Sequence, residues 1–482
     1  MRCLSRRTFC KRVAAGGAAL GLSLGASTSR AASGHGPDVR PNIVLILADD
    51  LGWMDLHCQG NKLVDTPNLD RLARQGMRFT DGYAAAPVCT PTRAAIMTGQ
   101  SPARLAITNH APGHPSGFAP PGAAVGEAEN AKYLPLKHVT IAERLKAAGY
   151  ATGFIGKWHL SCRRGQRDTP PSEVSLRPEH QGFDSNVGGC NYGGPPSYFD
   201  PYKNPTITDR RTGEYLPERL ADESIAFMTA HRDRPFFLAL WNYAVHYPRQ
   251  APADLLAKYS TRKGRGIKIQ AYAAMIEGLD RALGRVFKAL DTLGLADNTL
   301  LIFTSDNGSL DGDNRPLRGV KGYLYEGGIR VPWIVRWPGK VKPGTVCTTP
   351  IISTDLYPTL LQAAGLAPET GKVLDGESIV PLLRQTGRPR RDVLYWHYPN
   401  YAFHKENRLG SAIREGRFKL IKHYDDNSVE LYDLSKDTGE HSDLAAKLPA
   451  EARRLRERLE RWLSECGAKL PKPAPQTVSL SE

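Results

Sequence analysis

The sequence has no apolar run that approaches the ~20 residues needed for a membrane-spanning helix. It has no Cys-x-x-Cys pair, and no group of cysteines and histidines has the spacing of a zinc site. No internal repeat and no nucleic-acid-binding motif occurs along the chain. These absences exclude an integral membrane segment after signal removal, a zinc module and a repeat architecture, and they argue against a nucleic-acid partner.

Cysteine is scarce, with eight residues among 482. Six of these follow residue 31, and without Cys89 five are left, so they cannot all pair. One or two disulfides are possible in an oxidising compartment, but the sequence does not choose their partners. The six are Cys58, Cys89, Cys162, Cys190, Cys347 and Cys466.

The composition is that of a soluble globular protein, with 41% hydrophobic and 23% charged residues. A chain of 482 residues exceeds the usual size of a single core, so we expect a large domain over residues 41–370 and a smaller one over 371–470. Residues 471–482 are predicted to be a disordered tail. The net charge is +15, and removing residues 1–31 takes away six positive charges and no negative ones, which leaves +9. A surplus of this sign suits anionic substrates.

The N-terminus resembles an export signal. Residues 5–11 (SRRTFCK) carry a twin-arginine pattern, and a mildly apolar region follows over residues 13–26. Small residues allow cleavage after Ala31 or Ala32, so residues 1–32 are predicted to be a twin-arginine signal peptide of an exported, periplasmic or extracellular protein. The alternative is a disordered basic tail. Twin-arginine export usually follows folding in the cytoplasm, where cytoplasmic enzymes have access to the chain.

The order of the predicted elements indicates an α/β fold. Continuous apolar runs, typical of strands buried on both faces, occur over residues 42–48, 151–155, 236–241, 299–304 and 331–337. Helices are predicted between them, one capped by Thr66 and ended by Gly76, and one starting with a capping box of Thr140 and Glu143. The pattern predicts a large mixed, mostly parallel sheet with helices on both faces. Further helices are expected over residues 269–293 and 354–364.

After residue 371 the pattern changes to short strands near residues 413–414, 417–421 and 430–434, followed by a charged helix over 450–465. This predicts a smaller C-terminal domain with an antiparallel sheet and a helix. Two segments, 109–135 and 161–218, are irregular and rich in glycine and proline, and the first is a candidate substrate-facing loop.

Polar side chains follow four of the predicted strands directly. In open α/β sheets, ligands bind outside the carboxyl ends of the strands, so these groups are expected to converge. Three carboxylates and an amide suit a hard cation, Ca²⁺ or Mg²⁺, better than zinc. The alternative for an isolated Asp-Asp pair is helix capping or a turn. The four oxygen donors are Asp49, Asp50, Asp306 and Asn307, and the other polar groups are Lys157, His159 and His246.

One cysteine lies at the start of a predicted helix, in the run PVCTPTRAAIMTG over residues 87–99. Pro91 stiffens the turn, and Arg93 lies in the first helical turn. A thiolate at a helix N-terminus beside a cation is an activated nucleophile, whereas the alternative is a buried structural cysteine.

The whole run resembles the first signature of the type I sulfatases, and GYATGFIGKWH over residues 149–159 resembles the second. Further matches are His246-Tyr247-Pro248, residues 318–322 and residues 325–332, whereas Ser161 stands where a glycine is expected. The resemblance runs from about Asn42 into the C-terminal region and implies an alkaline phosphatase-like fold.

The resemblance implies a sulfatase in which a maturation enzyme oxidises Cys89 to formylglycine. Asp49, Asp50, Asp306 and Asn307 would bind Ca²⁺ rather than Mg²⁺, with residue 89 as the fifth protein ligand. Arg93, Lys157 and Lys321 would stabilise charged oxygens, His246 or Lys321 would protonate the leaving oxygen, and His159 would be the base that releases sulfate.

The expected substrate is a sulfated polysaccharide or glycoside. Two alternatives remain open, a phosphomonoester or phosphonate hydrolase of the same superfamily and a non-catalytic binder of sulfated glycans.

Overall fold

A computed structural model describes residues 40–112, 119–120, 122–161, 172–402 and 407–474. The predicted signal peptide and Cys162 lie outside the described residues. The chain from Arg40 onwards forms one compact unit. Among the described residues, no helix combines the length and the apolar character that crossing a bilayer requires.

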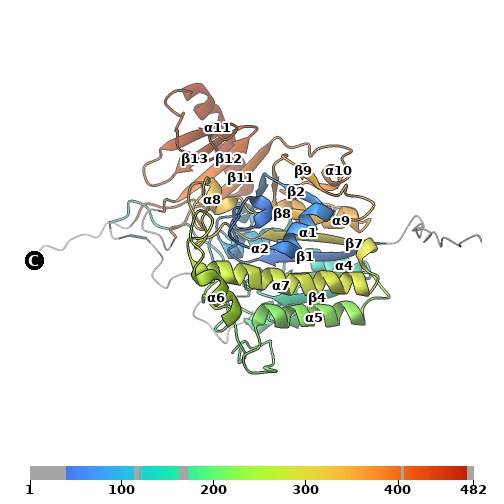
Figure 1. The fold of residues 1–482 in the computed structure, drawn as a ribbon. Helices are drawn as coiled ribbons and strands as arrows, with labels where there is room; N and C mark the ends of the chain where they lie inside the picture. The colour runs from blue at the N-terminus through green and yellow to red at the C-terminus, as the bar shows by residue number, and fades with distance from the viewer. Residues whose placement is uncertain (1–39, 113–118, 121, 162–171, 403–406, 475–482) are drawn as a thin grey trace, which may run out of the picture. The chain divides into compact units, whose positions relative to one another are not determined.

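An eight-stranded mixed sheet forms the centre of this unit (Figure 1). In spatial order the strands are β5 (Ser185–Val187), β4 (Ala151–Gly156), β6 (Phe236–Trp241), β1 (Asn42–Ala48), β7 (Thr299–Ser305), β8 (Trp333–Arg336), β2 (Met77–Phe79) and β9 (Thr345–Cys347). The first five strands in this order pair in parallel, and β8 runs antiparallel to β7 and β2. The predicted mixed, mostly parallel sheet is therefore confirmed.

Helices cover both faces of the sheet because its central strands are apolar on both sides. In β1, Val44 and Ile46 pack into one hydrophobic cluster, and Ile43 and Leu45 pack into another. The first cluster includes residues of α1 (Pro67–Gln75), α5 (Leu216–Ala230), α6 (Ala253–Ser260) and α7 (Gln270–Thr292). The second includes residues of α2 (Cys89–Thr98), α3 (Pro102–Leu105), α4 (Ile141–Ala147), α9 (Leu356–Ala363) and α10 (Val380–Leu383).

A separate four-stranded antiparallel sheet follows, in the order β11 (Val393–Tyr398), β12 (Gly410–Glu415), β13 (Phe418–His423) and β14 (Val429–Asp433). Leu455 and Leu459 of α11 (Pro449–Cys466) pack on one face of it. On the other face, Trp396 and Ile421 share a hydrophobic cluster with Tyr83 of the short strand β3 (Gly82–Tyr83), which pairs with β10 (Ile351–Ile352). The predicted antiparallel sheet with a helix is therefore present.

Several predicted details differ in the structure. Thr66 is the N-cap residue of α1, as predicted, but its side chain accepts a hydrogen bond from His57 N (3.0 Å) and makes no capping bond to the helix. The segment 161–218, predicted to be irregular, contains β5 and the start of α5. Of the predicted tail, residues 475–482 lie outside the described residues, and Lys472 O accepts a hydrogen bond from Gly126 N (2.8 Å). The capping box of Thr140 and Glu143, in contrast, is confirmed.

The cysteines of the described chain are all free thiols, and none forms one of the disulfides that the sequence allowed. They are Cys58, Cys89, Cys190, Cys347 and Cys466.

Candidate active site

The carboxyl ends of β1, β4, β6 and β7 bring the polar groups together. Ala48, the last residue of β1, pairs with Ser305 of β7, and Leu47 pairs with Trp241 of β6. Asp306 N donates to Ala48 O (3.2 Å), and Asp49 N donates to Ala244 O (2.9 Å). These bonds therefore hold together the starts of the loops that follow β1, β6 and β7. Asp49, Asp50 and Asp306 lie at these loop starts.

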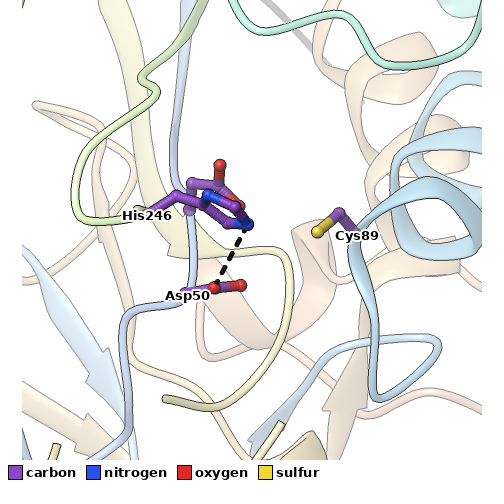
Figure 2. Close-up of side chains that lie close together, drawn as sticks. Asp50, Cys89 and His246 are labelled. Atoms are coloured by element: carbon purple, nitrogen blue, oxygen red, sulfur yellow. Dashed lines mark ion pairs between the residues drawn. The ribbon is translucent and has the colours of Figure 1, made fainter. Parts of the chain in front are cut away.

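Cys89 is the first residue of α2 and lies opposite these loops. Thr92 holds the preceding turn, because its hydroxyl accepts from Ala86 N (3.0 Å) and donates to Ala86 O (3.1 Å). The Cys89 side chain points toward Asp50 and His246 (Figure 2). Ligand atoms of these three residues and of Asp49 all lie within 4.8 Å of one another.

Burial of Cys89 disfavours ionisation of its thiol. It is 2% exposed, and this burial raises its pKa to about 12, although Lys157 and Lys321 act in the opposite direction. Desolvation thus outweighs the nearby cations, and the surroundings favour the buried thiol over the thiolate of the two alternatives.

Three buried cations pair with the three carboxylates. Arg93 Nε donates to Asp306 Oδ2 (2.9 Å), and Lys157 Nζ donates to Asp49 Oδ2 (2.6 Å). Lys321 Nζ lies 2.7 and 2.8 Å from the two oxygens of Asp50. Formal charges at this edge therefore sum to zero, and a divalent cation would make the site positive and complementary to an anion.

Two oxygens at the site have no hydrogen-bond partner although they are buried, Asp49 Oδ1 and Asn307 Oδ1. A buried acceptor without a partner costs free energy, so a partner is expected there. Burial also raises the pKa of Asp49 to about 8 in spite of Lys157. A hard cation suits both oxygens, and the donor set fits Ca²⁺ or Mg²⁺.

The observed cluster contains His246 in addition to predicted ligands, and two other predicted ligands, Asp306 and Asn307, make hydrogen bonds of their own. Both oxygens of Asp306 already accept hydrogen bonds, Oδ1 from Asp50 N (3.2 Å) and Oδ2 from Arg93. Asn307 Nδ2 donates to Asp50 Oδ1 (2.7 Å), which turns its unpartnered Oδ1 away from that carboxylate. His246, which was not predicted as a ligand, also lies in the cluster.

The two histidines have different surroundings. His246 Nε2 lies 3.7 Å from Asp50 Oδ2, as the dashed line in Figure 2 marks. His159 Nε2 is hydrogen-bonded to Ala111 O, and its Nδ1 lies 3.4 Å from Thr90 Oγ1. Burial lowers the pKa of both imidazoles well below the ordinary value, and Lys321 and Lys157 lower those of His246 and His159 further.

Some residues that shape the site carried no recognised signal in the sequence. Tyr272 of α7 donates to Asp50 O (2.8 Å) or to Asp55 Oδ2 (2.6 Å) and so fixes Asp50, whose φ is 61°. At Gly308, a Cβ atom would lie 1.9 Å from Gly327 O, so the loop after Asn307 requires glycine. Amphipathic spacing in α7 explains Tyr272 as a core residue and does not reveal this contact.

Comparison with known proteins identifies the family. The family model for sulfatases matches residues 41–366, and the model for the C-terminal region of N-sulphoglucosamine sulphohydrolase matches residues 320–468. The chain belongs to the sulfatase family. This sulfatase is a sulfuric ester hydrolase of the alkaline phosphatase superfamily, as the two signature-like runs predicted.

Curated relatives cover most of the chain. Human arylsulfatase A is 35% identical over an alignment of 463 positions that covers 84% of this chain and 83% of the relative. A sulfatase of Formosa agariphila is 33% identical over an alignment of 502 positions that covers 88% of this chain and 89% of the relative.

Solved structures share the fold. Ps i-CgsB in complex with k-i-k-neocarrahexaose has a TM-score of 0.73 at 30% identity, covering 88% of this chain and 93% of that one. The phosphonate monoester hydrolase of Agrobacterium radiobacter has a TM-score of 0.68 at 22% identity, covering 90% and 97%, and shows the fold alone.

Proposed function

We propose that this sulfatase removes sulfate from sulfated polysaccharides or glycosides, with formylglycine formed from Cys89 and a bound Ca²⁺ ion. The observation that carries the proposal is the position of Cys89, whose side chain points into a buried cluster of carboxylates and cations while its own thiol has a raised pKa. An unmodified thiol in this place is a poor nucleophile, so oxidation by a maturation enzyme gives the residue a chemical function.

The metal would be held by Asp49, Asp50, Asp306 and Asn307, with residue 89 as the fifth protein ligand. When bound, a divalent cation supplies Lewis-acid stabilisation of the sulfate oxygens. Support comes from the unpartnered oxygens of Asp49 and Asn307. Ca²⁺ is preferred to Mg²⁺ because a crowded, all-oxygen site of protein ligands suits the larger ion.

The protein's own cations would bind and orient the sulfate group. Arg93 and Lys157 are fully buried and Lys321 is 4% exposed, so all three act where water is excluded and electrostatic interactions are strong. His246 and Lys321 both approach Asp50, which places two proton carriers on one side of the cluster. One of them would protonate the leaving oxygen.

His159 would act as the base that completes release of sulfate. Its Nδ1 lies close to Thr90, the residue that follows Cys89, and its other ring nitrogen is held by Ala111 O. This arrangement fixes the ring and leaves Nδ1 as the nitrogen available for proton transfer.

The polysaccharide substrate is supported by the similarity to Ps i-CgsB, which was solved with a neocarrahexaose. The alternative of phosphomonoester or phosphonate hydrolysis is tested by comparing turnover of an aryl sulfate and the matching aryl phosphate. Family membership favours an enzyme over a non-catalytic binder of sulfated glycans.

The decisive experiment is peptide mass spectrometry of active enzyme produced with a maturation system. We expect the peptide that contains residue 89 to carry the aldehyde, and Cys89→Ala to fold normally without turning over an aryl sulfate. Full sulfatase activity from protein with an entirely unmodified thiol would refute the formylglycine mechanism.

We also propose export through the twin-arginine route, from the pattern in residues 5–11. Replacing Arg6 and Arg7 together by lysine should retain the protein in the cytoplasm, as measured by cell fractionation. Unchanged export of this variant would contradict the proposal.

A further inference from the structure

A cleft of about 860 Å³ lies between the C-terminal sheet and the segments beside β10. One wall comes from residues 348–350, 388–389 and 391–394, and the other comes from residues 414–418, 434–435 and 438. The volume is within the range of ligand-binding pockets, about 300–1,000 Å³. No function has been assigned above to any of these segments.

The cleft is distinct from the active site. Strand β12 begins at Gly410, near Asn407, whose Nδ2 donates to Gly322 O beside Lys321. The same strand ends at Glu415, which lines the cleft. Five residue steps of about 3.4 Å therefore separate its ends by roughly 17 Å.

Arginines line the cleft in excess over acids. The arginines are Arg330, Arg388, Arg391, Arg414, Arg417 and Arg454, and the acids are Asp81, Asp392, Glu415 and Glu451. Arg414 and Arg330 form the floor of the cleft and are only 8% and 7% exposed. Each forms an ion pair with an oxygen of Asp81, at 2.7 and 3.1 Å respectively. The floor is thus ordered by buried ion pairs.

Two cations remain available on the walls. Arg388 is exposed and has no hydrogen bond or ion pair within the described part of the chain. The Arg417 side chain is 54% exposed and forms an ion pair of 3.3 Å with Asp433. Exposed ion pairs of this kind contribute little free energy, so an incoming anion can compete for Arg417.

We propose that this cleft is a second binding site for the sulfated polysaccharide, outside the catalytic centre. Arg388 and Arg417 would bind sulfate groups with their planar guanidinium groups, and the hydroxyls of Thr348, Thr349 and Thr438 suit a partner rich in hydroxyl groups. The inference rests on the proposed polysaccharide substrate and extends it to a surface that does not take part in the chemistry.

The lining favours a glycan over a single-stranded nucleic acid. Nucleic-acid grooves of that kind carry aromatic side chains on which bases stack. Here Phe418 is the aromatic side chain among the lining residues, and the Arg417 guanidinium already lies 4.6 Å from its ring centroid. Binding at a second site would raise the effective concentration of the polymer at the active site.

The test compares a polymer with a small substrate. The double variant Arg388→Ser/Arg417→Ser should raise KM for carrageenan at least about threefold, because the second contact of the polymer is weakened. Its kcat and KM for 4-nitrophenyl sulfate should equal those of the unaltered enzyme. The matched control is Arg232→Ser/Arg234→Ser, which removes the same charge from the turn between α5 and β6. Neither residue lines the cleft, so this variant should keep the kcat and KM of the unaltered enzyme for both substrates.

Carrageenan binding is also measured by titration, which does not depend on turnover. Loss of affinity in the cleft variant alone supports the proposal. Equal losses in both double variants would mean that net charge is responsible, and unchanged affinity in the cleft variant would refute the site. Stronger binding of a single-stranded oligonucleotide than of carrageenan would also overturn it. Failure to hydrolyse 4-nitrophenyl sulfate would refute the proposed function separately.

Discussion

Asp49 and Asp50 are neighbours in the sequence but have different electrostatic surroundings. Burial raises the pKa of Asp49 to about 8, whereas at Asp50 the effect of burial is outweighed by Lys321, His246 and Lys157, which lower its pKa below the ordinary value. The left-handed φ of 61° at Asp50 turns consecutive side chains toward different partners. One Asp-Asp dipeptide thereby supplies a carboxylate paired with Lys157 and another paired with Lys321.

The metal site can be tested at Asn307 without leaving a charge unpaired. Asn307→Ala removes a buried oxygen that has no protein partner, so we expect Ca²⁺ affinity to fall at least ~10–100-fold. Elemental analysis and chelator titration measure the change. Asn298→Ala, which removes a side chain bonded to Arg40 O on the surface, is the control and should keep its metal. Unchanged Ca²⁺ content in Asn307→Ala, or stoichiometric zinc in the unaltered protein, would contradict the assignment.

Because the two histidines have different surroundings, replacing each of them should impair a different step of the reaction. His246→Ala should slow cleavage by about 10²–10⁴, most strongly for poor leaving groups, because it loses a proton donor. Lys321 contacts the same carboxylate and can share this role, so the loss should lie at the low end. His159→Ala should instead accumulate protein-bound sulfate.

Rates of both histidine variants on aryl sulfates of graded leaving-group pKa, together with mass spectrometry of the enzyme during turnover, separate these steps. An equal loss for His246→Ala across the whole series would show that His246 only positions the sulfate group.

Individual site residues were predictable where a polar group directly follows an apolar strand. Asp49, Asp306 and Lys157 follow β1, β7 and β4, and parallel strands bring their ends together. The contact of His159 with Ala111 was not predictable, because Ala111 lies in an irregular loop without a period that would place it.

Among the elements, strand β13 connects the C-terminal sheet to the loop region of the active site through one buried lysine. Lys419 Nζ lies 2.9 Å from Glu326 Oε1 and 2.8 Å from Glu440 Oε1, and all three side chains are fully buried. Glu326 begins α8 (Glu326–Ile329), directly after the segment that carries Lys321. Burial raises the pKa of Glu326, but Lys419, Arg330 and Arg414 outweigh it and lower the value to about 2.

Removing this lysine should destabilise the protein strongly. Lys419→Met leaves buried carboxylates without their cation, so the free energy of unfolding should fall by about 3–5 kcal/mol. Lys422→Met is a matched control on the same strand, since its contact with Glu460 is partly exposed and worth ~1 kcal/mol or less. Denaturant unfolding of both variants checks the difference. Similar losses would show that the buried cluster does not carry the expected energy.

The elements themselves were predicted where hydrophobic spacing was regular, as for α7 and β1. Helix α5 was missed although Leu220, Phe227 and Met228 recur with helical spacing, because its start falls in a segment rich in glycine and proline. Strand β11 was missed because apolar and polar residues do not alternate regularly along its aromatic sequence. Its Trp396 is buried against the central part, whereas Tyr395 stacks on Trp462 of α11.

At the scale of the whole molecule, the C-terminal sheet is attached to the catalytic centre at several points. Trp396 Nε1 donates to Ala84 O (2.8 Å), and Tyr398 OH donates to Asn109 Oδ1 (3.2 Å). Asn407 donates to Gly322 O, next to Lys321. The change of pattern after residue 371 indicated where this sheet begins. It gave no information on these bonds, because they join residues that are far apart in the sequence.

These attachments predict that the C-terminal sheet and the central sheet unfold together. The apolar cluster between them contains Trp396, Ile421 and Tyr83, and separating the sheets would expose it to water at about 25 cal/mol per Å². Native-state hydrogen exchange should therefore give the same opening free energy for the amides of β13 and β1. Lys419→Met should lower both values equally, although Lys419 is not a site residue, and should lower the temperature of activity loss with them. Opening of β13 at a clearly lower free energy, with β1 still protected, would show that the C-terminal sheet is an independent unit.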